Sequence, residues 1–300
     1  MNDSAVFTAR LFVALTATIL SIFYTFQMSQ GRCNIHPLYV QLVTAVVYTL
    51  SSFGFDDFVF TTVLFADGTQ VKVSIARYLF WVMTCPVILA GYIQLLHYMP
   101  TVQHDYIRTT FIVVKDIITM CFGILAAVQP AGTLKIIFLI ISFIFSFWLI
   151  IDMFFLLRER AIDFSERRLW IWLQVTSWLM LSSWMIFPLL FIIGPPGFSA
   201  ISEGGDAVGH AVGDLIAKNI FGFSVWYFRY YIVFPHRDRV MKEMAIKNPA
   251  MVSAAIVPAD RNSKKKVSSV TAPPVGNILV VEREPHIQRL IEYLTQDANV

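Results

Sequence analysis

A lysine and an aspartate lie four residues apart inside a long apolar segment, residues 204–234. On a helix, Asp214 and Lys218 would share one face and be within reach of each other. An isolated ammonium group in hydrocarbon costs several kcal/mol, so this lysine must be neutral, paired or covalently modified. Two interpretations follow. The pair is a structural ion pair of a membrane bundle, or Lys218 carries an aldehyde as a protonated Schiff base with Asp214 as its counterion.

The composition indicates that these residues belong to a membrane protein. Of 300 residues, 57% are hydrophobic and 14% are charged, and the mean hydropathy is +0.65. These values lie outside the range of soluble globular domains. The predicted fold class is therefore an all-α membrane protein, a bundle of seven transmembrane helices, each with about 20 apolar residues. The predicted spans are 5–27, 36–55, 73–95, 106–127, 132–156, 168–193 and 204–234.

The distribution of basic residues predicts the orientation of this bundle. Arginines and lysines gather in the loop after the fifth span and in the stretch after the seventh, whereas acidic residues prevail on the opposite side. The positive-inside rule places the N-terminus outside and the C-terminus in the cytosol, as in a multi-pass protein of the plasma membrane. The net charge of +3 comes from those loops and the tail, and no nucleic-acid partner is expected. Three scattered cysteines predict no disulfide framework and no metal site.

The composition changes after the last span, which predicts three parts. Residues 1–240 would form the membrane domain, and residues 241–275, with a run of three lysines and two consecutive prolines, a flexible cytosolic linker. Residues 276–300 are predicted to form one strand and one amphipathic helix. A single such unit is too short to bury a core alone, so it is interpreted as the start of a truncated second domain.

Several other polar residues need an explanation within the predicted spans. The second span has no carboxylate, yet Gln41, Thr44, Thr49 and Ser51 fall on one broad side of a helix. They either bond to their own turn and pack against neighbours, or they line a hydrated pore. Between the second and third spans, the dipeptide at 67–68 predicts a β-hairpin turn.

The third, fourth and sixth spans each contain an unusual group. Pro86 removes a backbone hydrogen bond from the third, which is expected to begin near Val71. Asp116, in the fourth, is predicted to be buried and to find a thiol or hydroxyl partner on the third. Trp184 and Phe187 precede a proline in the sixth, where rigid rings serve either as bulk facing lipid or as the wall of a flat ligand slot.

Taken together, residues 5–240 resemble a microbial rhodopsin. The resemblance rests on the pair Asp214 and Lys218, on Trp184 four residues before Pro188, and on the group Arg77, Tyr78 and Trp81. It implies a cofactor, all-trans-retinal, bound as a Schiff base to Lys218 with Asp214 as counterion. It also implies a photoreceptor or ion transporter and not an enzyme.

Within that family the chain is more similar to channelrhodopsins, in the segments TCPVIL (84–89), KDIITMCFG (115–123), FPLLFIIGPPGF (187–198) and GHAVGDLIAKN (209–219). This similarity implies that Cys85 and Asp116 form a gate pair and that the protein is a homodimer. The residues implied to enclose retinal are Trp81, Thr84, Thr119, Gly123, Ser142, Trp184 and Phe187.

The departures from the family pattern predict the subtype. Phe80 stands where a proton pump has its carboxylate acceptor and a halide pump a small polar residue, and Gly91 stands where a proton pump has its donor. The second span lacks the glutamates of cation channels. A wall without fixed negative charge favours anions. The chain thus resembles the anion channelrhodopsins, with pore residues Gln41, Thr44, Ser51, Arg77 and Asn219.

The predicted function is a light-gated channel for chloride or other small anions in a lipid bilayer. Two alternatives remain open, a light-gated cation channel and a sensory photoreceptor that signals through a cytosolic domain. The tail resembles the opening of a receiver domain, although Arg283 stands in its turn where an acid is usual.

Overall fold

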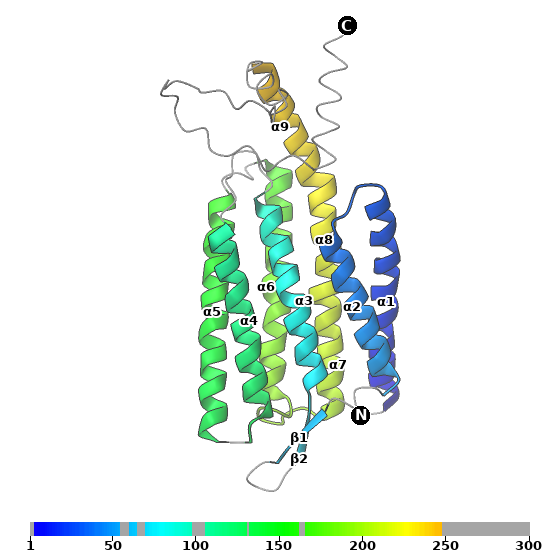
Figure 1. The fold of residues 1–300 in the computed structure, drawn as a ribbon, viewed down its shortest axis with the longest axis vertical. Coiled ribbons are helices and arrows are strands. Elements are labelled where there is room, and N and C mark those ends of the chain that lie inside the picture. Colours follow the sequence, from blue (N-terminus) through cyan, green and yellow to red (C-terminus); the bar gives the residue numbers. More distant parts are fainter. Residues whose placement is uncertain are drawn as a thin grey trace, which may run out of the picture. The chain divides into compact units, whose positions relative to one another are not determined.

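The computed structural model describes residues 3–54, 60–64, 70–97, 106–130, 132–161 and 166–247, and the chain divides into two compact units, residues 1–234 and 235–300. In the first unit, six helices precede residue 200: α1 (Asp3–Ser29), α2 (Ile35–Ser52), α3 (Ile75–Leu96), α4 (Tyr106–Val128), α5 (Thr133–Ala161) and α6 (Arg167–Ile193). They run side by side along their long axes, with α1 against α2 and α4 against α5 (Figure 1).

A further helical stretch of the chain contains two π-helical segments. It begins as α7 (Glu203–Asp214), which Ser202 caps by accepting a hydrogen bond from the Gly205 amide, and continues as a π-helix, η2 (Leu215–Ile220). It then passes through α8 (Phe221–Tyr227), a second π-helix, η3 (Phe228–Val233), and α9 (Phe234–Lys247). The sequence pattern predicts one uniform helix here. The π-turns are a difference that apolar periodicity does not reveal.

Most helix boundaries agree with the predicted spans to within a few residues. The last helical stretch runs on to Lys247, beyond the predicted end at 234, and the third helix begins later than expected. Residues 70–74 form strand β2 (Gln70–Ser74), paired antiparallel with β1 (Phe60–Leu64) in the register Phe60 to Ser74. The expectation that the third span begins near Val71 is therefore wrong, because the alternating valines at 71 and 73 join a strand and α3 begins at Ile75. The hairpin itself is confirmed. Its predicted turn at 67–68 lies outside the described residues.

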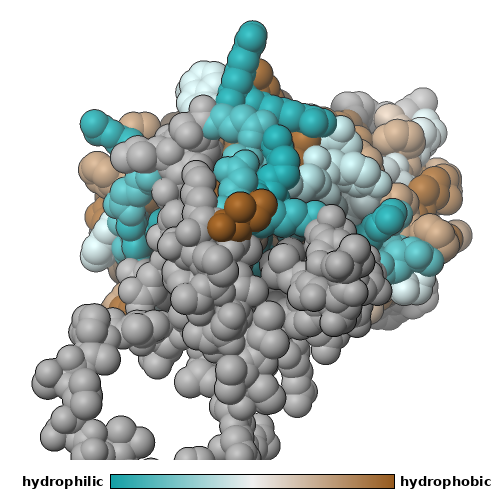
Figure 2. Space-filling model, turned by 90° about the horizontal axis from the view of Figure 1, so that it is seen from above, coloured by the Kyte–Doolittle hydropathy of each residue, from teal (hydrophilic) through white to brown (hydrophobic). Residues whose placement is uncertain are grey.

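Five of the described helices are long and apolar enough to cross a membrane, judged by length and composition: residues 4–29, 75–96, 106–128, 133–160 and 167–193. Large apolar side chains are exposed along them, for example Ile22, Phe111 and Trp178. Seen from above, hydrophobic residues lie along the left and right sides of the view (Figure 2). Exposed apolar side chains are what a protein surrounded by lipid requires. The count of seven spans stays a prediction.

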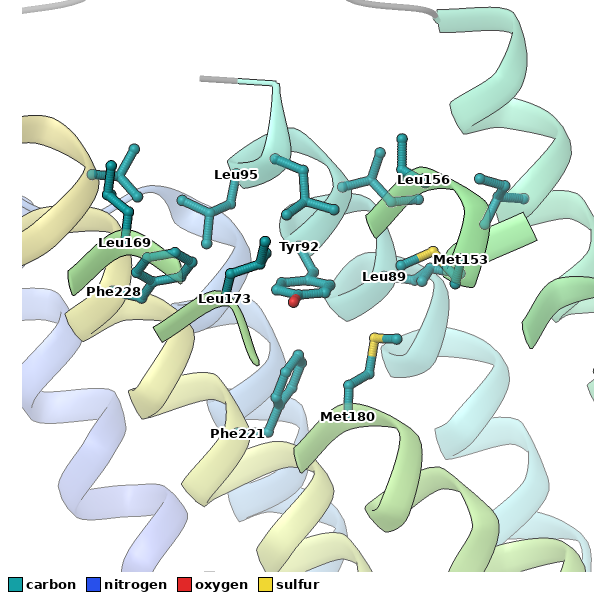
Figure 3. Packing of buried hydrophobic residues seen from close by; sticks show 14 of the residues in the cluster. Leu89, Tyr92, Leu95, Met153, Leu156, Leu169, Leu173, Met180, Phe221 and Phe228 are labelled. Carbon is teal, nitrogen blue, oxygen red and sulfur yellow. The ribbon is translucent and has the colours of Figure 1, made fainter. Parts of the chain in front are cut away.

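The largest apolar core in the described residues joins α3, α4, α5, α6 and the segment from α8 to η3. Tyr92 and Phe221 meet there with ring centroids 5.4 Å apart, near Leu173 and Met180 (Figure 3). The Tyr92 hydroxyl also lies 3.1 Å from Thr176 Oγ1 and 3.0 Å from Ser177 Oγ. This core holds α3 and α6 against the stretch that carries Lys218.

The predicted boundary at residue 240 falls inside α9, which continues to Lys247. The greater part of the predicted linker, and the whole receiver-like segment 276–300, lie outside the described residues.

Candidate functional site

Lys218 and Asp214 form an ion pair in the interior of the first unit. The two side chains are 1% and 0% exposed. The pair spans the junction between α7 and η2, and π-turns are frequent at functional sites. Asp214 Oδ2 also accepts hydrogen bonds from Tyr48 Oη at 2.6 Å and from Trp81 Nε1 at 3.4 Å. Three donors from three segments therefore hold one carboxylate.

Aromatic rings surround the amine of Lys218. Its nitrogen lies 4.2 Å from the centroid of the Phe80 ring, 5.9 Å from that of Trp81 and 5.6 Å from that of Phe187. All three distances are within the range of cation–π attraction, and the shortest is to Phe80. Tyr48 packs edge-on against Phe80, with centroids 6.0 Å apart. The Phe80 ring thus faces the amine.

The predicted pore residues of α2 lie on its buried side. Gln41 Nε2 donates to the carbonyl oxygen of Lys218 at 3.0 Å, which links α2 to η2. Thr44 is completely buried and its hydroxyl donates to Val40 O within its own turn, as one of the two open interpretations expects. Ser51 is also buried, and its carbonyl accepts a hydrogen bond from Arg10.

Asn219, the last predicted pore residue, is 1% exposed, and its side-chain amide has no hydrogen-bond partner within the described part of the chain. A buried amide without a partner is costly and is normally satisfied by water. The Asn219 side chain is therefore suited to bind a buried water molecule.

Arg77 belongs to a second polar group one to two turns before Asp214. Its guanidinium donates to Asp206 Oδ2 at 2.8 Å and lies 3.2 Å from His210 Nδ1. The His210 ring stacks on Trp81 with centroids 5.3 Å apart. Sequence reasoning did not select Asp206, His210 or Tyr48. The spacing of 206, 210 and 214 was the available signal, since residues four apart share a helix face.

Two cavities lie on opposite sides of the buried pair, between α2, α3 and the segment 203–233. The cavity on the side predicted to face outward, which we call the outer cavity, is lined by the end of α2, the start of α3 and α7, including Ser51, Phe80 and Asp214. The inner cavity is lined by the start of α2, the second half of α3 and the turns after Lys218, including His36, Gly91 and Arg229. The contacts around Lys218, Gln41 and Asp214 separate them.

The predicted gate residues, Cys85 and Asp116, are both buried and are near enough to interact electrostatically. No hydrogen bond joins them in the described residues, and Asp116 Oδ2 has no partner there. Thr84, beside Cys85, donates to Phe80 O in its own helix. The expected hydrogen bond from Asp116 to the third span is thus not formed in this structure.

The predicted retinal pocket forms two groups. In one, Trp81 and Phe187 have ring centroids 4.7 Å apart, and Trp184 packs against the same apolar cluster. In the other, Ser142 Oγ donates to Thr119 O at 2.9 Å, and a Cβ atom on Gly123 would lie 3.7 Å from Ser142 Oγ. A buried primary amine beside a carboxylate and an aromatic wall has the chemistry to hold a flat apolar aldehyde.

One ion pair between α4 and α5 was not anticipated. Lys115 Nζ pairs with Asp152 and lies 4.0 Å from the centroid of the Trp148 ring. Sequence reasoning did not supply a partner for Lys115, because Asp152 lies 37 residues further along.

Comparison with known families gives a match over most of the chain. The profile of the family described as bacteriorhodopsin-like protein matches residues 1–232. A comparison with curated protein sequences gives no match.

Solved structures share the fold at low identity. The red light-activated channelrhodopsin Chrimson is 24% identical, with a TM-score of 0.66 over 77% of this chain and 78% of its own. Halorhodopsin, a light-driven chloride pump, is 17% identical, with a TM-score of 0.66 over 79% and 98% of the two chains. A thermophilic rhodopsin from Rubrobacter xylanophilus is 19% identical, with a TM-score of 0.64 over 75% and 96%. Channels and pumps share this fold, so function depends on the site.

Proposed function

Because this chain belongs to the bacteriorhodopsin-like family of microbial rhodopsins, we propose that it is a light-gated channel for chloride and other small anions. Proteins of this family bind retinal as chromophore and transport ions or sense light, and they are not enzymes. The chain is a multi-pass membrane protein. The proposal concerns its subtype and the residues that carry it.

The uncharged buried face of α2 is the observation that carries the proposal. Gln41, Thr44 and Ser51 are buried on the side of α2 that faces α3 and the 203–233 segment, and α2 contains no acidic residue. The cavities on either side of Lys218 follow this face. A path along it meets the cationic groups of Lys218 and Arg77, each paired with one carboxylate, and α2 itself adds no negative charge. Such a wall favours anions over cations.

The position of Phe80 argues against a proton pump. Uphill proton transfer needs an acceptor close to the amine and a donor on the opposite side. Phe80 presents its ring 4.2 Å from Lys218 Nζ, and Gly91 lines the inner cavity where a donor would stand. Neither residue can accept or release a proton.

The proposed mechanism assigns separate tasks to the surrounding side chains. Lys218 is the attachment residue for retinal, which supplies absorption of visible light and isomerisation from all-trans to 13-cis. Asp214 is the counterion, and Tyr48 and Trp81 orient its second oxygen. Gln41 holds the carbonyl of Lys218 and so separates the two cavities. Movement of η2 away from α2 would join them, and Cys85 with Asp116 would govern how long they remain joined.

Currents under light test this proposal. Cells that express the chain with retinal are voltage-clamped, and external chloride is exchanged for a large organic anion. A reversal potential that follows chloride is expected. One that follows sodium or protons instead supports a cation channel, and absence of current at a membrane that contains pigment supports a sensory photoreceptor. Lys218→Ala should abolish both the visible band and the current.

The topology is part of the same proposal: seven spans, an outside N-terminus, a cytosolic C-terminus, a plasma-membrane location and a homodimer. The receiver-like segment 276–300 would lie in the cytosol. Protease protection in right-side-out vesicles tests the orientation, and cross-linking in membranes tests the dimer.

A further inference from the structure

An ion pair lies within the apolar spans of α4 and α5, away from Lys218. Lys115 in α4 pairs with Asp152 in α5, and the two side chains are 11% and 26% exposed. The ammonium also lies 4.0 Å from the centroid of the Trp148 ring. Charged side chains at this depth are expensive and are retained for a function by default. Nothing in the proposed conduction path uses this pair.

The neighbouring residue, Asp116, is held differently. It is 1% exposed, and its Oδ2 has no hydrogen-bond partner in the described residues. No hydrogen bond of that oxygen therefore fixes where the carboxyl group points within the packed interior. Its direction follows from the rotation of the α4 backbone about the helix axis.

Lys115 restrains that rotation. Consecutive residues of an α-helix are about 100° apart around the axis, so a lysine fixed toward α5 fixes the direction of the next side chain. A second α4–α5 link, the hydrogen bond from Ser142 Oγ to Thr119 O, lies one turn further along α4. The two links together hold α4 and α5 as one unit around Asp116.

We propose that the ion pair between Lys115 and Asp152 positions the carboxyl group of Asp116 relative to Cys85 and thereby sets the lifetime of the light-activated state. Lys115 and Asp152 are positioning residues in this scheme. The inference rests on the proposed role of Cys85 and Asp116 as a gate pair. It does not depend on which ion, if any, is conducted.

The chain contains a matched control for this pair. Arg108 and Glu159 link the same two helices at 2.5 Å, each seven residues nearer the same end, with side chains 31% and 53% exposed. An exposed ion pair contributes little, and Arg108 is eight residues from Asp116. A general stabilising effect of α4–α5 ion pairs would appear at both places, whereas an effect on Asp116 would appear only at the buried one.

The test measures the decay of the light-activated state by flash photolysis of the purified protein with retinal. The double variant Lys115→Met/Asp152→Leu removes both charges, because removal of one would leave an unpaired buried charge. We expect the decay time to change by about threefold or more. The control Arg108→Met/Glu159→Leu should leave it unaltered. In an Asp116→Asn background, Lys115→Met/Asp152→Leu should have no further effect.

Two more variants make the result decisive. Exchange of the charges, in Lys115→Asp/Asp152→Lys, should return the decay time toward that of the unmodified protein. Asp152→Glu retains the ion pair but lengthens the acidic side chain by one methylene group. If the double variant binds no retinal, the decay time of Asp152→Glu is the deciding measurement. An unaltered decay time in the tested variant, or an equal change with and without Asp116, overturns the inference. Altered decay without any ion current would contradict the proposed channel function but leave this inference intact.

Discussion

The carboxylate of Asp214 has three partners, and its interactions with them differ in strength. It pairs with Lys218, accepts a short hydrogen bond from Tyr48 at 2.6 Å and a longer one from Trp81 at 3.4 Å. Hydrogen bonds to charged groups contribute about 1.5–3 kcal/mol, and loss of one partner of a buried ion pair costs about 3–5 kcal/mol. Substitutions around this carboxylate should therefore have graded effects.

We expect Tyr48→Phe to retain the visible absorption band and Asp214→Asn to lose most of it at pH 8. In the first variant the carboxylate still faces the amine, whereas in the second a buried positive charge has no anion. Absorption spectra between pH 5 and 9 and thermal bleaching of purified protein measure both effects. If the two variants had visible absorption bands of equal intensity and equal bleaching temperatures, the assignment of Asp214 as counterion would be refuted.

Phe80 acts on the same amine without a charge. A ring face near a cation stabilises positive charge localised on that nitrogen. If retinal is bound there, loss of the ring should favour charge spread along the chromophore, and Phe80→Leu should move the band to longer wavelength. Phe80→Tyr, which retains a ring, is the control and should shift the band less. A shift to shorter wavelength in Phe80→Leu alone would contradict a cation–π role.

At the scale of elements, the turn between α6 and α7 fixes where α7 begins along the end of α6, and so where Asp214 lies. Gly194, Pro195, Pro196 and Gly197 form this turn, and the amide of Gly197 donates to Gly194 O at 3.0 Å. A Cβ atom on Gly197 would lie 2.1 Å from Ile192 O and 2.5 Å from Phe191 O. Backbone carbonyls cannot yield to such a contact without displacing the end of α6.

Gly197→Ala should consequently lower the stability of the protein by about 1–3 kcal/mol, the usual range for overpacking. Gly205→Ala, in the first turn of α7, is the matched control, since its Cβ would meet Ser202 Oγ only at 3.4 Å. Replacement of a helical glycine by alanine without a clash is neutral or stabilising. Thermal bleaching of the two variants beside the unmodified protein measures the difference, and a Gly197→Ala protein as stable as Gly205→Ala would disprove the steric argument.

At the scale of the whole molecule, the proposed channel would select ions by the potential along the path between the two cavities. Ser51 lines the outer cavity, whereas Ser52, the next residue, does not. A carboxylate at the first position would place negative charge on the path, and one at the second would not. The two serines therefore form a matched pair for testing whether the uncharged side of α2 favours anions.

Ser51→Glu should reduce the permeability of chloride relative to sodium by roughly threefold or more, and Ser52→Glu should leave it nearly unaltered. Reversal potentials of the light-induced current, measured at two external chloride concentrations, report the ratio. A selectivity that responds equally to both substitutions would place the path elsewhere than along α2.

The sequence alone determined the features that depend on local pattern. Runs of about 20 apolar residues mark a helix because each backbone group is satisfied within its own segment, and the described helices begin and end close to the predicted spans. The pairing of Asp214 with Lys218 was also predictable, since residues four apart on a helix meet. Both are consequences of helix geometry, which needs no knowledge of neighbours.

Only the tertiary structure decided which distant side chains complete the site. Tyr48 reaches Asp214 across 166 residues and Arg77 reaches Asp206 across 129, and apolar periodicity carries no information about such pairs. The Lys115–Asp152 pair and the π-turn at Lys218 depend in the same way on how neighbouring helices pack. The local pattern specified the helices, and their packing specified which polar groups face one another, because contacts between helices depend on rotation and depth that no single segment encodes.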